Sequence, residues 1–135
     1  MPSPKNKLHA DYMAHYPNDD TTELLNPRLE LFRIDKPPTN ITAEKGWITS
    51  NNEVILLSGA VRLRNEDKNG DLELQVDTSD VKILVNEDYA ETDKHAIITG
   101  PRSRIETDGL RTYMNQNKVE LLNNVRGKIN PKQKP

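Results

Sequence analysis

A regular alternation of apolar and polar residues constrains the fold of this chain more than any other feature. Residues 72–77, Leu-Glu-Leu-Gln-Val-Asp, alternate without interruption. The same pattern recurs at 61–64, 81–85 and 119–121. Successive side chains of a β-strand point to opposite faces, so each segment would bury one face and expose the other. The alternation predicts an antiparallel β-sheet with one solvated side. The best candidate for helix is a capped turn at 20–25, which Pro27 would end.

Pairs of turn-forming residues separate these segments at short intervals. They are Asn26-Pro27, Pro37-Pro38, Asn51-Asn52, Ser58-Gly59, Asn69-Gly70, Gly100-Pro101, Asp108-Gly109 and Asn123-Asn124. Short strands between polar turns predict an all-β sandwich or barrel-like fold, and 135 residues suit one domain. No proline occurs between Thr39 and Gly100. Because proline cannot donate to a β-ladder, the central strands are expected there.

Two local features add detail to the strand pattern. Asn69-Gly70 supplies the two positive-φ residues of a type I′ hairpin turn. The hairpin would pair Lys68 with Asp71, Leu63 with Val76 and Val61 with Thr78. Residues 55–61 also resemble 119–125, with Gly59 in the place of Asn123. A glycine or asparagine that interrupts an alternating strand predicts a kink or bulge there.

Composition excludes several classes of protein. The chain has no cysteine, which excludes disulfides, thiolate metal sites and a cysteine nucleophile. Its net charge of −2 argues against binding nucleic acid. No apolar run is long enough to cross a membrane, and no signal peptide is recognisable. The acidic stretch at 66–93 and the basic stretch at 126–135 are either solvated surface or charge that steers a partner.

Residues with catalytic or metal-binding chemistry form no recognisable motif. Glu91, Asp93 and His95 are spaced to share one face of a strand, which would make half a metal site. The solvated face of a strand explains the same spacing. Glu106 and Asp108 could form a carboxylate pair, but close pairs of acids are common in a chain this acidic, and Asp108-Gly109 is typical of a turn. We therefore predict a binding or scaffold protein, not an enzyme, with no metal and no cofactor. If two sheets splay apart, their inner face would be a groove for a lipid or acyl chain; otherwise the domain is a thin conventional sandwich.

Several segments, taken in order, carry a family resemblance. Residues 7–20 contain L-x-A…Y-x-x-D, 25–29 contain P-x-L, 41–48 contain A-x-x-G-x-I and 55–61 contain L-x-G-x-V. Threonine-ended steps follow at 74–78 and 90–92, and Gly109-Leu110 precedes a closing strand at 119–127. This ordered set resembles the periplasmic domain of the LptC family, the bitopic inner-membrane component of the lipopolysaccharide transport bridge. The related LptA proteins share the L-x-G-x-V step.

The resemblance implies a twisted, open β-jellyroll of antiparallel strands in two sheets. Its apolar interior would pass the acyl chains of lipopolysaccharide, and the protein would catalyse no reaction. The domain would span 7–129, with a linker remnant at 1–6 and a basic tail at 130–135. The family begins with a transmembrane helix and further strands before Leu8. We therefore expect a truncated form of a periplasmic protein that is anchored to the inner membrane in its full-length form.

The resemblance and the alternation together assign candidate lipid-facing residues. Leu24 and Val119 match lipid-facing places of the family, and the alternation adds Ile55, Leu57, Val61, Leu74, Val76 and Ile83. Glu73, which directly precedes Leu74, is expected on the solvated face. Plain core packing would place the same apolar residues inward.

Edge strands would join neighbouring jellyrolls by β-augmentation. The N-terminal edge, represented by Leu8, Ala10 and Tyr12, would meet the LptB2FG ABC transporter. The C-terminal edge would meet LptA through Leu121, Asn123, Val125, Gly127 and Ile129. Gly100, in the loop that ends a long strand, is grouped with these edge residues. The predicted function is to accept lipopolysaccharide from the transporter and pass it to LptA; the alternatives are an LptA-like soluble bridge and a small β-sandwich sugar-binding or hydrolase domain.

Overall fold

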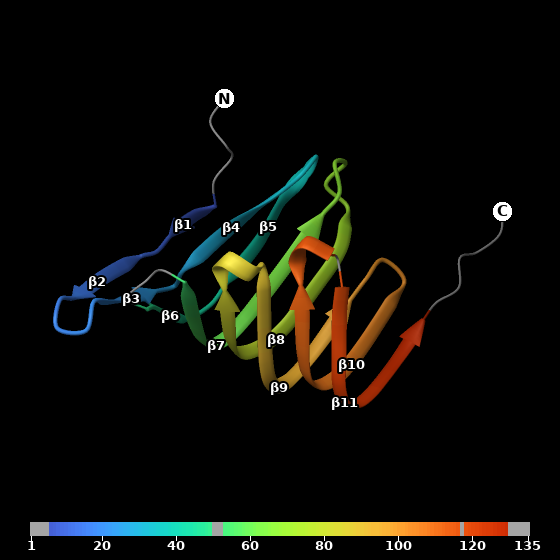
Figure 1. The fold of residues 1–135 in the computed structure, drawn as a ribbon. Coiled ribbons are helices and arrows are strands. Elements are labelled where there is room, and N and C mark those ends of the chain that lie inside the picture. Colours follow the sequence, from blue (N-terminus) through green and yellow to red (C-terminus); the bar gives the residue numbers. More distant parts are fainter. Residues whose placement is uncertain (1–5, 50–52, 117, 130–135) are drawn as a thin grey trace.

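The computed structural model describes residues 6–49, 53–116 and 118–129, which form an antiparallel β structure (Figure 1). The strands are β1 (Lys7–His9), β2 (Tyr12–Tyr16), β3 (Thr21–Leu25), β4 (Arg28–Arg33), β5 (Lys36–Thr42), β6 (Lys45–Ile48), β7 (Val54–Glu66), β8 (Leu72–Leu84), β9 (Tyr89–Thr99), β10 (Ser103–Tyr113) and β11 (Lys118–Ile129). Two 3₁₀ turns, η1 (Val85–Glu87) and η2 (Met114–Gln116), interrupt them. The expected all-β class is confirmed. The turn expected at Asn51-Asn52 and the terminal segments 1–5 and 130–135 lie outside the described residues.

The helical turn expected at 20–25 is wrong, because this segment is strand β3. It pairs with β2 on one side and with β6 on the other. The sequence pattern there, Thr-Thr-Glu-Leu-Leu, has no strong preference of its own. Hydrogen bonding to two neighbouring strands therefore decides its conformation, as tertiary context commonly does for weak local signals.

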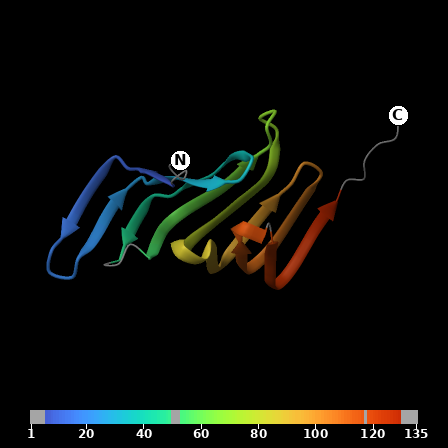
Figure 2. The ribbon, with the colours of Figure 1, turned by 45° about the horizontal axis from the view of Figure 1, so that its top comes forward.

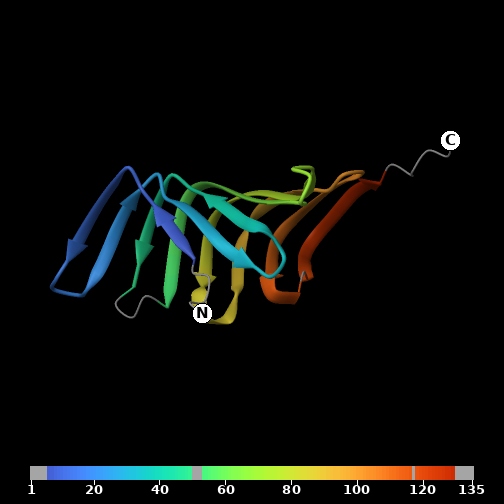
Figure 3. The same ribbon diagram turned by 90° about the horizontal axis from the view of Figure 1, so that it is seen from above.

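Strand β7 divides the sheet into two layers. Its first half pairs with β6 and its second half with β5. We call the layer with β2, β3 and β6 the first layer, and the layer with β1, β4 and β5 the second layer. Strands β7 to β11 pair in sequence, bend in the middle and contribute one half to each layer (Figures 1 and 3). The two predicted sheets are thus the two layers of one hydrogen-bonded network.

Residues with a left-handed backbone lie at the bends of β7, β8, β10 and β11. The β7–β8 register shifts between Leu57 and Ala60, and Gly59 has a φ of +79°. The amides released by the shift bind carboxylates, since Gly59 N donates to Asp80 Oδ1 at 3.1 Å and Ala60 N donates to Glu44 Oε2 at 2.5 Å. The bulge predicted at Gly59 is confirmed.

The bends of β10 and β11 follow the same principle. Gly109 in β10 has a φ of +87°, and Asn124 in β11 has a φ of +51°. The predicted interruption of the last strand is therefore confirmed, although the left-handed residue is Asn124 and not its neighbour Asn123. The hydroxyl of Thr107 donates to the carbonyls of Gly109 and Asn123, which the bends would otherwise leave unpaired.

The β7–β8 hairpin has the predicted register but a different turn. Leu63 pairs with Val76 and Val61 with Thr78, as expected. Only Gly70 of the Asn69-Gly70 pair has a positive φ, so the turn is not type I′, and Lys68 does not pair with Asp71. Asp67 Oδ1 instead accepts from the amides of Asn69 and Asp71, each at 2.9 Å. An aspartate that caps its own turn favours a type I turn followed by a glycine bulge.

The core lies between the two layers. Its buried members are Leu29, Ile41, Ile55, Leu57, Val61, Leu63, Val76, Ile83, Ala90, Ala96, Ile98 and Leu110. The strands β7, β8 and β9, which supply most of them, fall in the proline-free region, as predicted. Pro37 and Pro38 do lie in β5, but outside its Asn40–Thr42 segment, which pairs with β7. Among the described residues, no helix has the length and apolar character needed to cross a bilayer.

Candidate functional site

The two layers part along one side and leave a groove. Two adjoining cavities occupy its mouth, with volumes of about 230 Å³ and about 350 Å³. Both are lined by Lys36, Thr39 and Met114, so they are direct neighbours. The residues that line the larger cavity come from the β4–β5 hairpin, from Asp88 directly after η1 and from Met114 in η2.

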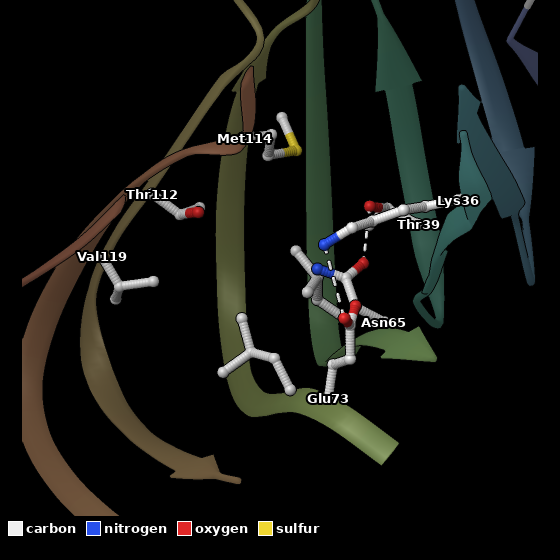
Figure 4. A pocket seen from close by; sticks show the side chains of 9 residues that line it. Lys36, Thr39, Asn65, Glu73, Thr112, Met114 and Val119 are labelled. Carbon is white, nitrogen blue, oxygen red and sulfur yellow. Dashed lines mark hydrogen bonds and ion pairs between the residues drawn. The ribbon is translucent and has the colours of Figure 1, made fainter. Parts of the chain in front are cut away.

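The predicted inward residues fall into three depths of this interior. Leu74 and Val119 line the cavity of about 230 Å³ from opposite layers (Figure 4). Val61 and Val76 line a deeper void of only about 20 Å³. Leu24, Ile55, Leu57 and Ile83 are buried and line none of these spaces. The alternation thus selected inward residues, while their access to a ligand differs from one to the next.

The groove also contains polar residues that the alternation did not single out. Thr39 and Asn65 are buried in the second layer, and Thr39 Oγ1 donates to Asn65 Oδ1 at 2.6 Å. Thr112 lies across the cavity from them, in the first layer (Figure 4). The sequence could have identified Asn65, because the inward series Val61, Leu63, Asn65 has an amide where the next apolar side chain is expected.

The expectation for Glu73 is wrong, since its side chain lines the cavity mouth. Its carboxylate binds Arg33 Nη1 at 3.1 Å and Lys36 Nζ at 3.4 Å (Figure 4 shows the second pair). The Arg33 guanidinium also donates to the carbonyl oxygens of Pro37 and Glu66. These bonds draw Glu73 toward the β4–β5 hairpin and tie that hairpin to the β7–β8 hairpin.

Unpaired strand edges lie at both ends of the described sheet. Strand β1 pairs only with β4 and β2 only with β3, while β11 pairs only with β10. Figure 2 shows β2 and β11 at opposite ends of the molecule. The β11 edge is 12 residues long, whereas β1 and β2 have 3 and 5 residues.

Most predicted edge residues lie on these strands. Leu8 is in β1, Tyr12 is in β2, and Leu121, Asn123, Val125, Gly127 and Ile129 are in β11. Ala10 occupies the break between β1 and β2. Gly100 is a correction: it follows β9 in the turn to β10, where its amide donates to Ser103 O at 2.9 Å. It does end a long strand, but both strands that flank it are interior to the sheet.

His95 does not join Glu91 and Asp93 as the spacing suggested. Its Nδ1 lies 3.0 Å from Asp108 Oδ1 and its Nε2 lies 3.0 Å from Glu106 Oε1, across the β9–β10 pair. The hydrogen bonds to Asp108 and then Glu106 raise the pKa of His95, and the bond to His95 lowers the pKa of each carboxyl group. Asn124 Nδ2 donates to the second oxygen of Asp108 at 2.8 Å, so this surface cluster reaches the bend of β11.

Comparison with known proteins gives the family. The crystal structure of LptH, described as the LptA homologous periplasmic component of the conserved lipopolysaccharide transport device from Pseudomonas aeruginosa, is similar with a TM-score of 0.73 and 10% identity, over 93% of this chain and 95% of that chain. The likeness confirms the expected open β-jellyroll. No curated protein matches the chain. The model of the family "Lipopolysaccharide-assembly, LptC-related" matches residues 3–130, and this chain therefore belongs to that family.

Proposed function

We propose that this protein is a non-enzymatic lipopolysaccharide-binding subunit of the transport bridge. It accepts lipopolysaccharide from the inner-membrane ABC transporter LptB2FG and passes it to LptA. The observation that carries the proposal is a groove between two layers that lies between unpaired strand edges. The jellyroll of 7–129 is the functional domain, located in the periplasm and anchored to the inner membrane in the full-length protein.

Acyl chains enter this groove from its mouth. Leu74 and Val119 are among the apolar side chains that line the mouth, and Val61 and Val76 line the smaller void next to it. A void of about 20 Å³ is too small for an acyl chain. Passage therefore requires the layers to separate, which would bring the buried Leu24, Ile55, Leu57 and Ile83 into contact with lipid. The acyl chain then replaces the apolar contacts that separation breaks, which limits the cost of opening.

Photo-crosslinking tests the lipid path. A photoreactive residue replaces Leu74 or Val119 at the groove, or Lys82 on the outward face of β8 as a control. We expect labelling of lipopolysaccharide from the two groove positions and none from position 82. Equal labelling from all three positions, or none from a folded protein, would contradict the proposal.

The long β11 edge is the proposed docking site for LptA. Its unpaired backbone groups would continue the sheet into the partner. Photoreactive residues at Val125 and Ile129 are expected to crosslink to LptA, while the same residue at Ile34, on the β4–β5 hairpin, is not. The shorter edge, including Leu8, Ala10 and Tyr12, is left for LptB2FG.

An LptA-like soluble bridge is the second candidate, favoured by the similarity to LptH. Such a protein would join copies of itself end to end, edge against edge. Sedimentation velocity separates the two candidates. A mass that rises with concentration in the absence of partners supports the LptA-like role, and a constant mass with binding to added LptA supports the LptC role.

A further inference from the structure

A buried amide stands at the mouth of the groove. Asn65 is 8% exposed and Thr39 is 2% exposed, and both line the cavity of about 230 Å³. The amide carbonyl is occupied, because Thr39 Oγ1 donates to Asn65 Oδ1 at 2.6 Å. The amide nitrogen faces the cavity (Figure 4) and is in no hydrogen bond between described residues.

Covering this amide with hydrocarbon alone would be costly. An amide nitrogen that loses water to a bound chain without gaining a hydrogen-bond partner disfavours the binding of that chain. Leucine at position 65 would continue the inward series of Val61 and Leu63 without that cost. In this structure Thr39 Oγ1 bonds the carbonyl end of the amide, which leaves Nδ2 turned to the cavity (Figure 4).

Polarity changes along the groove. Thr39 and Asn65 are at the mouth and Thr112 lines both spaces, whereas most of the residues around the deeper void are aliphatic, such as Ile41, Val76 and Leu110. A bound molecule would therefore place a hydrogen-bonding group at the mouth and a hydrocarbon chain below it. An acyl chain joined to its headgroup through an ester or amide has this order of groups.

Charge does not select the ligand at this point. Arg33 and Lys36 are cationic, but Glu73 binds both of them and Asp88 lines the adjoining cavity. Two bases and two acids leave the mouth nearly neutral. Recognition there depends on hydrogen-bond geometry more than on attraction of an anion.

We propose that Asn65 Nδ2 donates to the carbonyl oxygen of the ester or amide that links an acyl chain to its headgroup. Thr39 is a positioning residue, because its hydroxyl is hydrogen-bonded to the other end of the amide and holds the side chain against β5. This inference rests on the proposed lipid-binding function and adds a specificity: the groove distinguishes acyl-linked lipids from lipids of the same length without the carbonyl.

Two lipids that differ only in this group test the inference. Myristoyl lysophosphatidylcholine carries an ester carbonyl, and its myristyl ether analogue lacks it. Binding to the full chain is measured below the critical micelle concentration of each lipid. One hydrogen bond predicts that the wild-type protein prefers the ester by about 3- to 10-fold.

A double substitution tests whether Asn65 and Thr39 cause this preference for the ester. Thr39→Val with Asn65→Leu removes both polar partners at nearly constant shape, which avoids leaving one of them unpaired. We expect this variant to bind the two lipids equally. Asn40→Leu, on the exposed side of β5, is the control and keeps the wild-type preference. If the double variant does not fold, Asn65→Ala withdraws the amide donor and leaves Thr39 in place.

The outcomes separate this inference from the function on which it rests. If both lipids bind the wild type equally, Asn65 does not recognise the carbonyl, although lipid binding stands. If the double variant keeps the preference for the ester, another donor is responsible and the inference is wrong. If neither lipid binds, the proposed function fails together with the inference.

Discussion

At the scale of single residues, Gly59 controls the bend of β7. Alanine there would adopt a φ of +79°, and its Cβ would collide with the Glu44 side chain that accepts from Ala60 N. Gly70 is the matched control, since its φ is +85° and nothing lies within 4 Å of an added Cβ. We expect Gly70→Ala to lower the free energy of unfolding by about 1 kcal/mol. Gly59→Ala should lower it by about 2–4 kcal/mol because it also displaces a charged hydrogen bond. Urea unfolding measures both, and equal losses would contradict this account of the bend.

His95 makes stability depend on pH at the residue scale. Its pKa is raised above the ordinary 6.5 by Asp108 and then Glu106. A histidine whose pKa is higher in the folded state stabilises the fold fully below pH 6.5, its ordinary pKa. This stabilisation is lost as the pH rises through the raised pKa. Glu106 and Asp108 have lowered pKa values, so they stabilise the fold above their ordinary pKa values of 4.5 and 3.8. Their stabilisation is lost as the pH falls below those values.

The expected result is a difference between two unfolding profiles. From about pH 6 to about pH 8, the wild type should lose stability relative to His95→Gln. The difference should shrink in high salt because the cluster is on the surface. Thermal unfolding across this range measures it, with His15→Gln as a histidine control. Parallel profiles for wild type and His95→Gln would show that the cluster does not contribute.

At the scale of elements, the β7–β8 hairpin depends on Asp67 and not on Asn69. Asp67 accepts two backbone amides at 2.9 Å, whereas Asn69 does not adopt a positive φ. Asp67→Ala is expected to lower the free energy of unfolding by about 1–2 kcal/mol. Asn69→Ala is expected to stay within about 0.5 kcal/mol of the wild type. A type I′ turn would reverse the order of these effects, so urea unfolding of both variants decides between the turns.

At the scale of the whole molecule, the proposed function assigns assembly to the β11 edge. Val125 and Ile129 on this edge are exposed, by 49% and 75%. Lysine is a common means of blocking edge-to-edge pairing. Val125→Lys with Ile129→Lys should therefore abolish association with LptA and any self-association, and should leave the melting temperature nearly unchanged. Sedimentation velocity measures the assembly, and Ile34→Lys, on the distant β4–β5 hairpin, should have no effect. Undiminished association of the double variant would exclude β11 as the docking edge.

The sequence by itself determined the strands of its alternating segments, the bulge at Gly59 and the inward set from Ile55 to Ile83. These features depend on the alternation of side chains along one strand and on the φ preference of glycine, which are local properties. The ordered motifs also resembled the correct family. The type of the β7–β8 turn was not predicted correctly from the Asn69-Gly70 pair. The side chain of Asp67, outside that pair, accepts two backbone hydrogen bonds that favour a different turn.

Only the tertiary structure decided which residues meet across strands and layers. His95 binds Glu106 and Asp108 because the β9–β10 register brings them together, and Glu73 turns to the groove because Arg33 and Lys36 of another hairpin bind it. Asn65 is part of a cavity only because the first layer stands opposite. These contacts join residues far apart in the chain, and their partners are fixed by register and by the packing of one layer against the other. A local pattern carries no information about either, so it could list the inward residues but could not tell which of them line the open groove.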